Sequence, residues 1–323
     1  MRNKFSCLFG CVGAIIGAGF VSGREVVSFF SRYGGHSWWL IGLAVITMIF
    51  LCRICMRNET DGGTKWSFQQ GCLLLVLMIL SGSMTAAAGR MVSLILPVKG
   101  AYLLGITGTL CLAWLLGKKN VKPLSVLSVA LTVLFLGMTL FALRDGTSVT
   151  PLKPKTTAFG LVKAALYAVG YGAMNIAVSM EIICRNGRCC ETEQNRRSVL
   201  LGLVLGGMLF VSNSLYLNNP QVHDAAFPIV PFAAELGRAG YLLCVGMLYL
   251  AVLTTLIALV LVIRSGIERL HLPQASVMPI TLGIPAALSC IGFTEIVEHL
   301  YAPAGLFCLV ILFLPMLRKQ KSS

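Results

Sequence analysis

Charged residues are scarce in this sequence. Asp, Glu, Lys and Arg make up 12% of the 323 residues, hydrophobic residues make up 57%, and the mean hydropathy is +0.84. A soluble domain carries about a quarter of its residues as charges, so this composition excludes one of this length. The loops between the apolar tracts are short and leave no room for a separate soluble domain. We therefore expect a single transmembrane domain over residues 1–323.

Catalytic motifs are missing as well. The sequence has no Ser/His/Asp spacing, no H-E-x-x-H zinc motif, no phosphate-binding loop and no nucleotide-binding fingerprint. We expect neither an enzyme nor a resident cofactor. Five cysteines lie near the inner loops without a histidine beside them, which favours reduced thiols over a zinc site; they are Cys52, Cys55, Cys184, Cys189 and Cys190.

Long charge-free tracts are what the sequence has in abundance. Ten of them hold 17 to 26 residues each, close to the roughly 20 residues that cross a bilayer as a helix. They are residues 5–23, 33–52, 66–89, 100–117, 123–143, 164–180, 198–223, 239–263, 270–294 and 299–317. This pattern predicts an all-α integral membrane protein with ten transmembrane helices.

The basic residues are divided unevenly between the two sides of this ten-span arrangement. With the N-terminus placed inside, 17 Lys and Arg residues fall on the inner side and 8 on the outer side. Such a bias is typical of cytoplasmic loops, so both termini are predicted to be cytoplasmic and the location to be the cell membrane. Topology thus accounts for the net charge of +14, and nucleic acid is not an expected partner. The expected partners are a small-molecule solute and the lipid bilayer.

The ten spans divide into two halves of five, at about residues 5–143 and 158–317. An odd number of spans in each half inverts the second half relative to the first. Inverted five-helix repeats are one plan of secondary transporters, whose solutes bind where two equivalent helices are broken. We therefore expect the first and the sixth helix to be broken.

The first apolar tract holds too many glycines for one continuous helix. Each interior glycine costs a helix about 1 kcal/mol relative to alanine, and four crowd its second half: Gly13, Gly17, Gly19 and Gly23. A break here exposes backbone N–H groups that attract a solute carboxylate. The predicted solute ligands of this segment are Gly17, Ala18, Gly19, Phe20 and Ser22, of which Ser22 is also a candidate helix cap.

The sixth tract has a similar mixture of glycine, aromatic and amide residues at mid-depth. Gly170 and Gly172 flank Tyr171, and Asn175 follows one turn later. A break there makes Tyr171 and Asn175 candidate solute ligands, whereas close helix packing through small residues is the alternative.

Hydroxyl residues on two other helices are further candidates. Ser81 and Ser83 of the third tract can line a solute site or simply pack. Thr254 and Thr255 are adjacent hydroxyls in an otherwise apolar helix, and such oxygens suit a monovalent cation. The alternative is that each threonine bonds back to a carbonyl of its own helix.

The outer mouth has two features of its own. Arg24 and Glu298 can pair there as a gate, although solvation of Arg24 beside Glu25 is the alternative that the sequence favours slightly. The loop of residues 218–240 contains three prolines and an apolar stretch, which predict one or two short helices over the mouth. These helices act either as a lid or as an interfacial anchor.

The first tract also carries a motif. Residues 17–25, Gly-Ala-Gly-Phe-Val-Ser-Gly-Arg-Glu, followed by Phe29 and Phe30, resemble the G-A-G-F-A-S-G-Q-E signature of the YkvI-like bacterial membrane proteins. That family belongs to the amino acid–polyamine–organocation superfamily, which has the LeuT-type fold. Val21 and Arg24 depart from the signature. A cation so close to the break would reject cationic solutes or attract anionic ones.

The resemblance implies a bundle of helices 1, 2, 6 and 7 that rocks against a scaffold of the other six. It implies a solute between Gly17–Phe20 and Tyr171–Asn175. It also implies a sodium ion, held by carbonyls near Ala14 and Gly17 together with Thr254 and Thr255. The function expected is sodium-coupled symport of a small amino acid or related organic solute by alternating access. A receptor that keeps this fold without transport, as in spore germinant receptor subunits, is the alternative.

Overall fold

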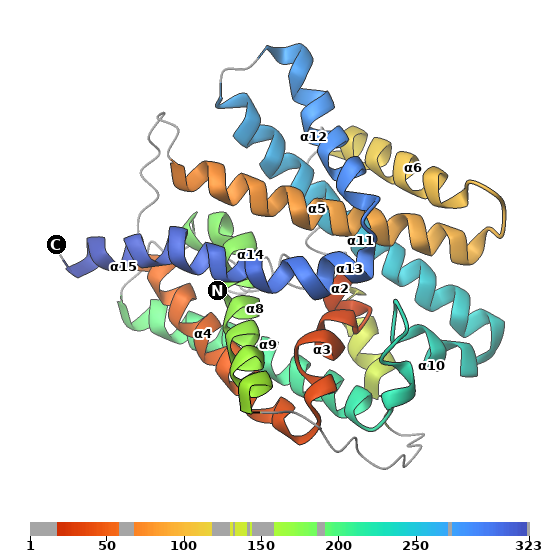
Figure 1. Ribbon diagram of the computed structural model, residues 1–323, viewed down its shortest axis with the longest axis horizontal. Helices are drawn as coiled ribbons and strands as arrows, with labels where there is room; N and C mark the ends of the chain where they lie inside the picture. Colours follow the sequence, from red (N-terminus) through yellow and green to blue (C-terminus); the bar gives the residue numbers. More distant parts are fainter. Residues whose placement is uncertain are drawn as a thin grey trace.

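The computed structural model describes residues 18–57, 68–117, 130–131, 133–140, 143, 158–185, 191–270 and 273–321 (Figure 1). Within these residues six helices are long and apolar enough to cross a membrane, and Ala101–Leu116 is apolar but shorter. The expectation of a multi-pass helical membrane protein is therefore confirmed. The count of ten spans stays a prediction, because the first and fifth tracts are described only in part.

The long helices are α4 (Ser37–Arg57), α5 (Phe68–Ile95), α6 (Ala101–Leu116), α8 (Ala158–Arg185), α9 (Glu191–Leu217), α11 (Gly237–Glu268) and α12 (Gln274–Ser289). Short helices lie between them: α2 (Ala18–Val21), α3 (Arg24–Phe29), η1 (Ser31–His36), η2 (Pro220–Val222) and α10 (Val230–Glu235). The C-terminal segment forms α13 (Phe293–Glu295), α14 (Tyr301–Cys308) and α15 (Leu314–Lys321), joined by the π-helical turns η3 (Ile296–Leu300) and η4 (Leu309–Phe313).

Large apolar side chains cover the outside of the long helices. Ile46 of α4, Leu103 of α6 and Leu203 of α9 are 66%, 64% and 62% exposed. Exposed apolar surface of this extent is typical of a face that contacts another apolar phase, here the lipid. Charged residues mark the helix ends instead, as with the Arg264–Glu268 pair of α11, whose Nε and Oε1 atoms lie 2.7 Å apart.

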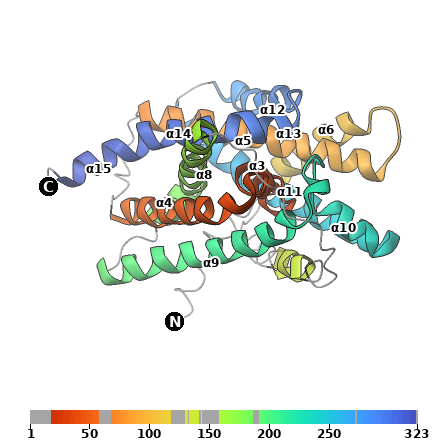
Figure 2. The ribbon, with the colours of Figure 1, turned by 60° about the horizontal axis from the view of Figure 1, so that its bottom comes forward.

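The long helices pack in two groups. α8 packs against α4 and α14, and α4 packs against α9. α5 packs against α6, α11 and α12. Figures 1 and 2 show α4, α8 and α9 on one side of the molecule and α5, α6 and α12 on the other. The grouping of α4, α8 and α9 resembles the expected bundle, but α14, which the resemblance assigns to the scaffold, also packs against α8.

The first helix is interrupted within the described residues. α2 ends at Val21, Ser22 and Gly23 form a turn, and α3 begins at Arg24. Gly23 has φ of 82°, in the left-handed region that favours glycine. A break in the first helix is therefore present at Ser22–Gly23. Ala18 and Gly19 of the predicted break lie within α2, and Gly17 lies outside the described residues.

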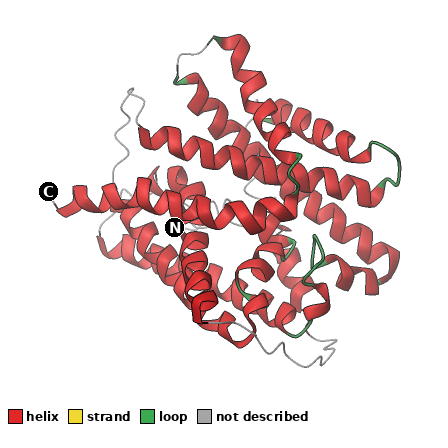
Figure 3. Cartoon of the chain, viewed as in Figure 1, coloured by secondary structure: helices red, strands yellow, loops and turns green. Residues whose placement is uncertain are grey.

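The sixth helix is not broken, and the expectation of a second break is wrong. α8 runs as one α-helix from Ala158 to Arg185, in a chain whose described residues are helix or loop (Figure 3). Its glycines serve close packing. A Cβ on Gly170 would lie 2.7 Å from the Ala302 carbonyl oxygen of α14, and one on Gly172 would lie 2.9 Å from the Ala44 carbonyl oxygen of α4. Small residues that let neighbouring backbones approach explain the sequence pattern without any unwinding.

Candidate functional site

The turn between α2 and α3 is held by its own polar atoms. The Ser22 hydroxyl donates to the Gly19 carbonyl at 3.0 Å and accepts from the Arg24 N–H at 3.3 Å. The Gly23 N–H donates to the Phe20 carbonyl at 3.0 Å. The N-cap of α3 is Gly23, which makes no side-chain cap bond, so Ser22 is not the cap that the sequence offered; its hydroxyl accepts from the first N–H of the helix instead. Tyr216 of α9 closes the turn from the other side, because its ring leaves no room for a Cβ on Gly23.

A buried carboxyl group lies beside this turn. Glu25 is 5% exposed, and its side chain occupies the space where a Cβ of Gly19 would lie. The carboxyl forms a side-chain hydrogen bond with Tyr171 of α8. Its Oε2 atom is buried and has no hydrogen-bond partner among the described residues.

Side chains from two other helices extend the polar cluster. The hydroxyls of Tyr301 on α14 and Ser83 on α5 are hydrogen bonded to each other, and Tyr301 lies close enough to the Glu25 carboxyl to interact with it electrostatically. The Asn175 amide donates to the Tyr171 carbonyl at 2.8 Å, one turn back along α8. Glu25, Ser83, Tyr171, Asn175 and Tyr301 thus form a polar centre between the bundle and the scaffold, which we call the central cluster.

Aromatic rings pack around Tyr171 of the central cluster and around Phe20 of α2. The ring centroids of Phe29 and Phe30 lie 5.0 Å and 5.3 Å from that of Tyr171. Phe20 packs edge-on to Phe135, with centroids 5.8 Å apart. All five rings are at most 1% exposed, so Tyr171 lies in a buried aromatic environment.

The structure brings together only part of the predicted solute site. Gly19, Phe20 and Ser22 lie at the break, and Ser83, Tyr171 and Asn175 lie in the central cluster. Ala18 starts α2. Ser81 is buried, but its hydroxyl donates to the Met78 carbonyl at 2.8 Å, within its own helix. Gly17 lies outside the described residues.

The predicted sodium ligands are described only in part. Ala14 and Gly17 lie outside the described residues. Thr254 and Thr255 both donate to the Ala251 carbonyl, at 3.0 Å and 2.9 Å, which is the back-bonded arrangement that the sequence left open. α2 packs against α11, so the two threonines belong to a helix that contacts the first.

Arg24 and Glu298 form an ion pair, as the gate hypothesis requires. Arg24 is only 4% exposed, so the alternative of a solvated Arg24 and Glu25 is wrong. Arg32 contacts the same Glu298 oxygen at 2.7 Å. The pair is possible because η3 packs against α3.

The loop between α9 and α11 lies directly over the gate. It forms two short helices, η2 and α10, as the sequence predicts. The Arg24 guanidinium donates to the carbonyls of His223 at 2.7 Å and Ala225 at 3.1 Å. The Ile229 N–H donates to the Ser22 carbonyl at 3.1 Å. We call residues 218–236 the cover, because they are tied both to the break and to the gate.

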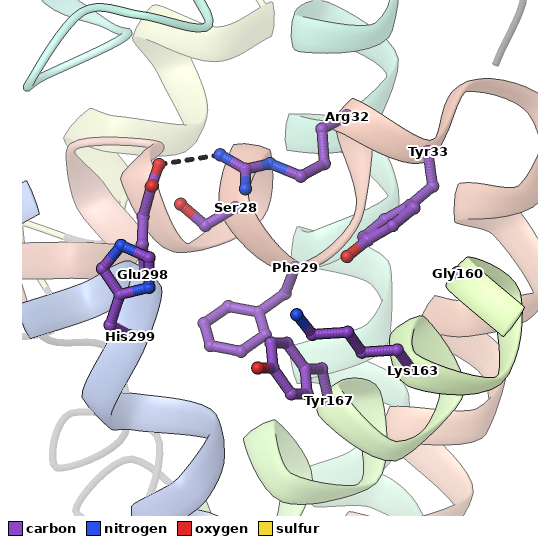
Figure 4. A pocket seen from close by; sticks show the side chains of 9 residues that line it. All are labelled: Ser28, Phe29, Arg32, Tyr33, Gly160, Lys163, Tyr167, Glu298 and His299. Atoms are coloured by element: carbon purple, nitrogen blue, oxygen red, sulfur yellow. Dashed lines mark hydrogen bonds and ion pairs between the residues drawn. The ribbon is translucent and has the colours of Figure 1, made fainter. Parts of the chain in front are cut away.

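A pocket of about 190 Å³ opens beside the gate (Figure 4). Its lining residues are Ser28, Phe29, Arg32, Tyr33, Gly160, Lys163, Tyr167, Glu298 and His299. The Lys163 ammonium lies 5.3 Å from the centroid of the Tyr167 ring, a cation–π contact. Cationic and aromatic side chains thus dominate the approach to the Arg24–Glu298 pair.

Removing the gate cation is expected to destabilise the protein strongly. In Arg24→Gln, Glu298 and two cover carbonyls lose a buried partner, and breaking such a pair costs about 3–5 kcal/mol. The matched control is Arg32→Gln, whose 40% exposed side chain binds the same oxygen and whose loss costs about 1 kcal/mol or less. Unfolding free energies in detergent measure both. Equal losses would show that Arg24 behaves as a surface residue.

Two members of the central cluster escaped the sequence analysis. The sequence favoured an interpretation in which Glu25 and Arg24 are solvated, and Tyr301, which lies in an apolar tract, was not predicted as a site residue. The signal for Glu25 was present, because an ionisable residue next to a membrane break is a functional candidate by default. Nothing in the sequence connects Tyr301 with Ser83, which precedes it by 218 residues.

Comparisons with known proteins show the fold. No family model matches the chain. It is 28% identical to the Bacillus subtilis (strain 168) protein described as "Uncharacterized protein YyaD", over 96% of each chain. It also superposes on crystal structures of the Eremococcus coleocola manganese transporter. One, of a variant, gives a TM-score of 0.62 at 16% identity, covering 97% of this chain and 79% of the transporter. Another, in complex with an aromatic bis-isothiourea substituted compound, gives 0.60 at 16% identity, covering 98% and 80%. The chain therefore shares the fold of a membrane transporter.

Proposed function

We propose that this protein is a secondary transporter of a small amino acid or related organic solute. The observation that carries the proposal is the break at Ser22–Gly23, which lies beside a buried polar cluster and beneath a closed ion pair. Irregular backbone at membrane depth is tolerated only against protein or a cavity. In transporters such breaks bind the solute. The shared fold of the manganese transporter supports the same class of function.

The solute is proposed to lie between the break and the central cluster. Its carboxylate would meet backbone N–H groups of the Gly17–Phe20 segment, and Tyr171 and Asn175 would contact the rest. Since α8 is continuous, these two contacts come from side chains and not from unwound backbone. The arrangement suits a short solute, because aromatic rings pack around Tyr171.

Alternating access is proposed to follow the division of the helices. The bundle α4, α8 and α9 would rock against the scaffold α5, α6, α11 and α12, in the LeuT-like plan of two inverted five-helix repeats. α3 belongs to the moving side, because it packs against α8 and α9. Its movement would break the Arg24–Glu298 pair and release the cover.

Sodium is the coupling ion that the sequence predicts, and its site is proposed between the first helix and α11. Each threonine hydroxyl uses its hydrogen on Ala251 and keeps oxygen lone pairs for a cation. In Thr254→Ala with Thr255→Ala we expect sodium activation of uptake to weaken about tenfold or more, since a lost ligand is worth about 1–3 kcal/mol. The control is Thr107→Ala, a similarly back-bonded hydroxyl on the exposed face of α6. Unchanged sodium activation would remove the proposed sodium site.

Transport itself is tested in proteoliposomes with a mixture of radiolabelled amino acids, with and without an inward sodium gradient. Uptake above that of protein-free vesicles supports the proposal. Binding without flux would favour the receptor alternative. A manganese arm belongs in the same assay, because of the fold neighbour. We expect no manganese uptake, since the described residues contain no group of three His, Cys, Asp or Glu that could hold a metal ion.

A further inference from the structure

Glu25 is the ionisable residue of α3 that the gate does not use. It follows Arg24 directly, and consecutive residues of a helix project in different directions. Arg24 reaches Glu298 and the cover, while Glu25 turns to Gly19 and Tyr171. One short helix therefore carries both the gate cation and a buried carboxyl group.

No cation contacts the Glu25 carboxyl in the described part of the chain. The ionisable groups that face it are two tyrosines, Tyr171 of α8 and Tyr301 of α14. On α9, Tyr216 packs against Gly23 instead, and its buried hydroxyl has no hydrogen-bond partner in the described chain.

The charged groups of the other neighbouring elements are engaged elsewhere. Glu298 of η3 pairs with Arg24 and with Arg32 of η1. His299 of η3 and Lys163 of α8 line the outer pocket (Figure 4). The Glu25 carboxyl is thus left with a tyrosine hydroxyl and one oxygen that is unpartnered among the described residues.

An ionised carboxylate in this setting is expensive, because low-dielectric surroundings penalise an unpaired charge. The same carboxyl carrying a proton is far easier to bury. Water reaching the site reverses the preference, since it solvates the carboxylate. The protonation of Glu25 therefore depends on whether α3 is seated or displaced.

We propose that Glu25 is the binding site for a proton that crosses the membrane together with the solute. The carboxyl holds the proton while α3 is seated and the gate is closed. When the bundle moves and water enters on the other side, the O–H bond breaks and the proton passes to a water molecule. Because Glu25 and Arg24 share α3, release of the proton and rearrangement of the gate occur in one movement. The inference rests on the proposed transport function and adds to it a coupling ion separate from the sodium expected at α11.

The proton itself can be observed without any solute. A protonated carboxyl group has its own infrared carbonyl band. We expect this band at neutral pH in lipid-reconstituted wild type and in Glu295→Gln, and its loss in Glu25→Gln. Glu295 is a suitable control because its side chain is 59% exposed. If Glu25→Gln does not fold, Glu25→Asp takes its place, and we expect the frequency of the carbonyl band to shift in that variant. The inference would be overturned if the wild-type spectrum had no such carbonyl band, or if the band were unchanged by substitution of Glu25.

Coupling is measured in the same vesicles by two assays with the labelled amino-acid mixture. Exchange of internal for external label needs no ion gradient and reports transport alone. Accumulation driven by an inward pH gradient, at equal sodium, reports proton coupling, with a ceiling of about tenfold per pH unit for one proton per solute. We expect both in wild type and in Glu295→Gln, and in Glu25→Gln we expect the ratio of accumulation to exchange to stop responding to the pH gradient.

The outcomes separate the two proposals. If the wild type exchanges label but its accumulation does not depend on the pH gradient, proton coupling is wrong and the proposed transport function is still supported. Loss of exchange in a folded Glu25→Gln would show that the carboxyl serves the solute or the structure, against the proton site. Absence of exchange in wild type would count against the transport function, and the infrared band would still decide whether Glu25 holds a proton.

Discussion

Gly23→Ala is expected to abolish uptake and to lower stability strongly. Two penalties add at this position. A side chain at φ of 82° costs about 1–2 kcal/mol, and the new Cβ would overlap the Tyr216 hydroxyl and ring, with overpacking that costs about 1–3 kcal/mol more. Relief of that overlap must shift the fully buried Tyr216 side chain or displace α3 or α9, and α3 carries the Arg24 gate. Thermal unfolding in detergent and proteoliposome uptake measure the two effects.

A matched variant separates the two penalties. Gly100 has nearly the same backbone, with φ 92° and ψ −1° against 82° and −5° for Gly23, and nothing within 4 Å of a built Cβ. Gly100→Ala should therefore show the backbone cost alone. Adding Tyr216→Phe to Gly23→Ala should restore part of the difference. That exchange is mild by itself, because the Tyr216 hydroxyl has no partner among the described residues. Equal losses in Gly23→Ala and Gly100→Ala would show that the contact with Tyr216 is not tight.

Gly305→Ala is expected to have the second large effect, through the packing of α14 on α8. The new Cβ would overlap the backbone carbonyl of Gly170, and no side-chain rotation can relieve a clash with backbone. Separation of the two helices is the remaining response. We expect a loss of about 3 kcal/mol, the upper end for overpacking, together with loss of uptake because Tyr171 and Tyr301 move apart.

Gly207→Ala on α9 is the control for that experiment. Nothing lies within 4 Å of its built Cβ, so alanine there should be neutral or stabilise the helix by up to about 1 kcal/mol. If Gly305→Ala unfolded at the same temperature as Gly207→Ala, the close approach of α8 and α14 would not exist in the folded protein.

The helices could be located from the sequence because membrane helices leave a local signal, a charge-free tract of the right length. The roles of glycines could not. Gly23 and Gly170 both lie in apolar tracts beside polar residues, yet one sits in a turn and the other in an unbroken helix. The difference depends on partners distant in the chain, Tyr216 for the first and Gly305 for the second.

The candidate site shows the same limit. The ion pair of Arg24 with Glu298 could be proposed because opposite charges near one mouth attract, but their burial follows from the cover, whose position no local pattern fixes. Glu25 was misjudged because its neighbour in sequence is a cation, and on a short helix that neighbour points elsewhere. Ser83 contacts the Tyr301 hydroxyl of α14 as well as the Leu80 carbonyl of its own helix, while Ser81, two residues earlier, donates to the Met78 carbonyl.

The Ile229 N–H of the cover donates a hydrogen bond to the Ser22 carbonyl, an acceptor that the break leaves without a partner in its own helix. While it is made, the interrupted backbone has an internal donor and does not lack hydrogen bonding. If the cover lifts as proposed, the Ser22 carbonyl would lose this donor, and an ammonium group of the solute could then donate a hydrogen bond to it in place of the Ile229 N–H.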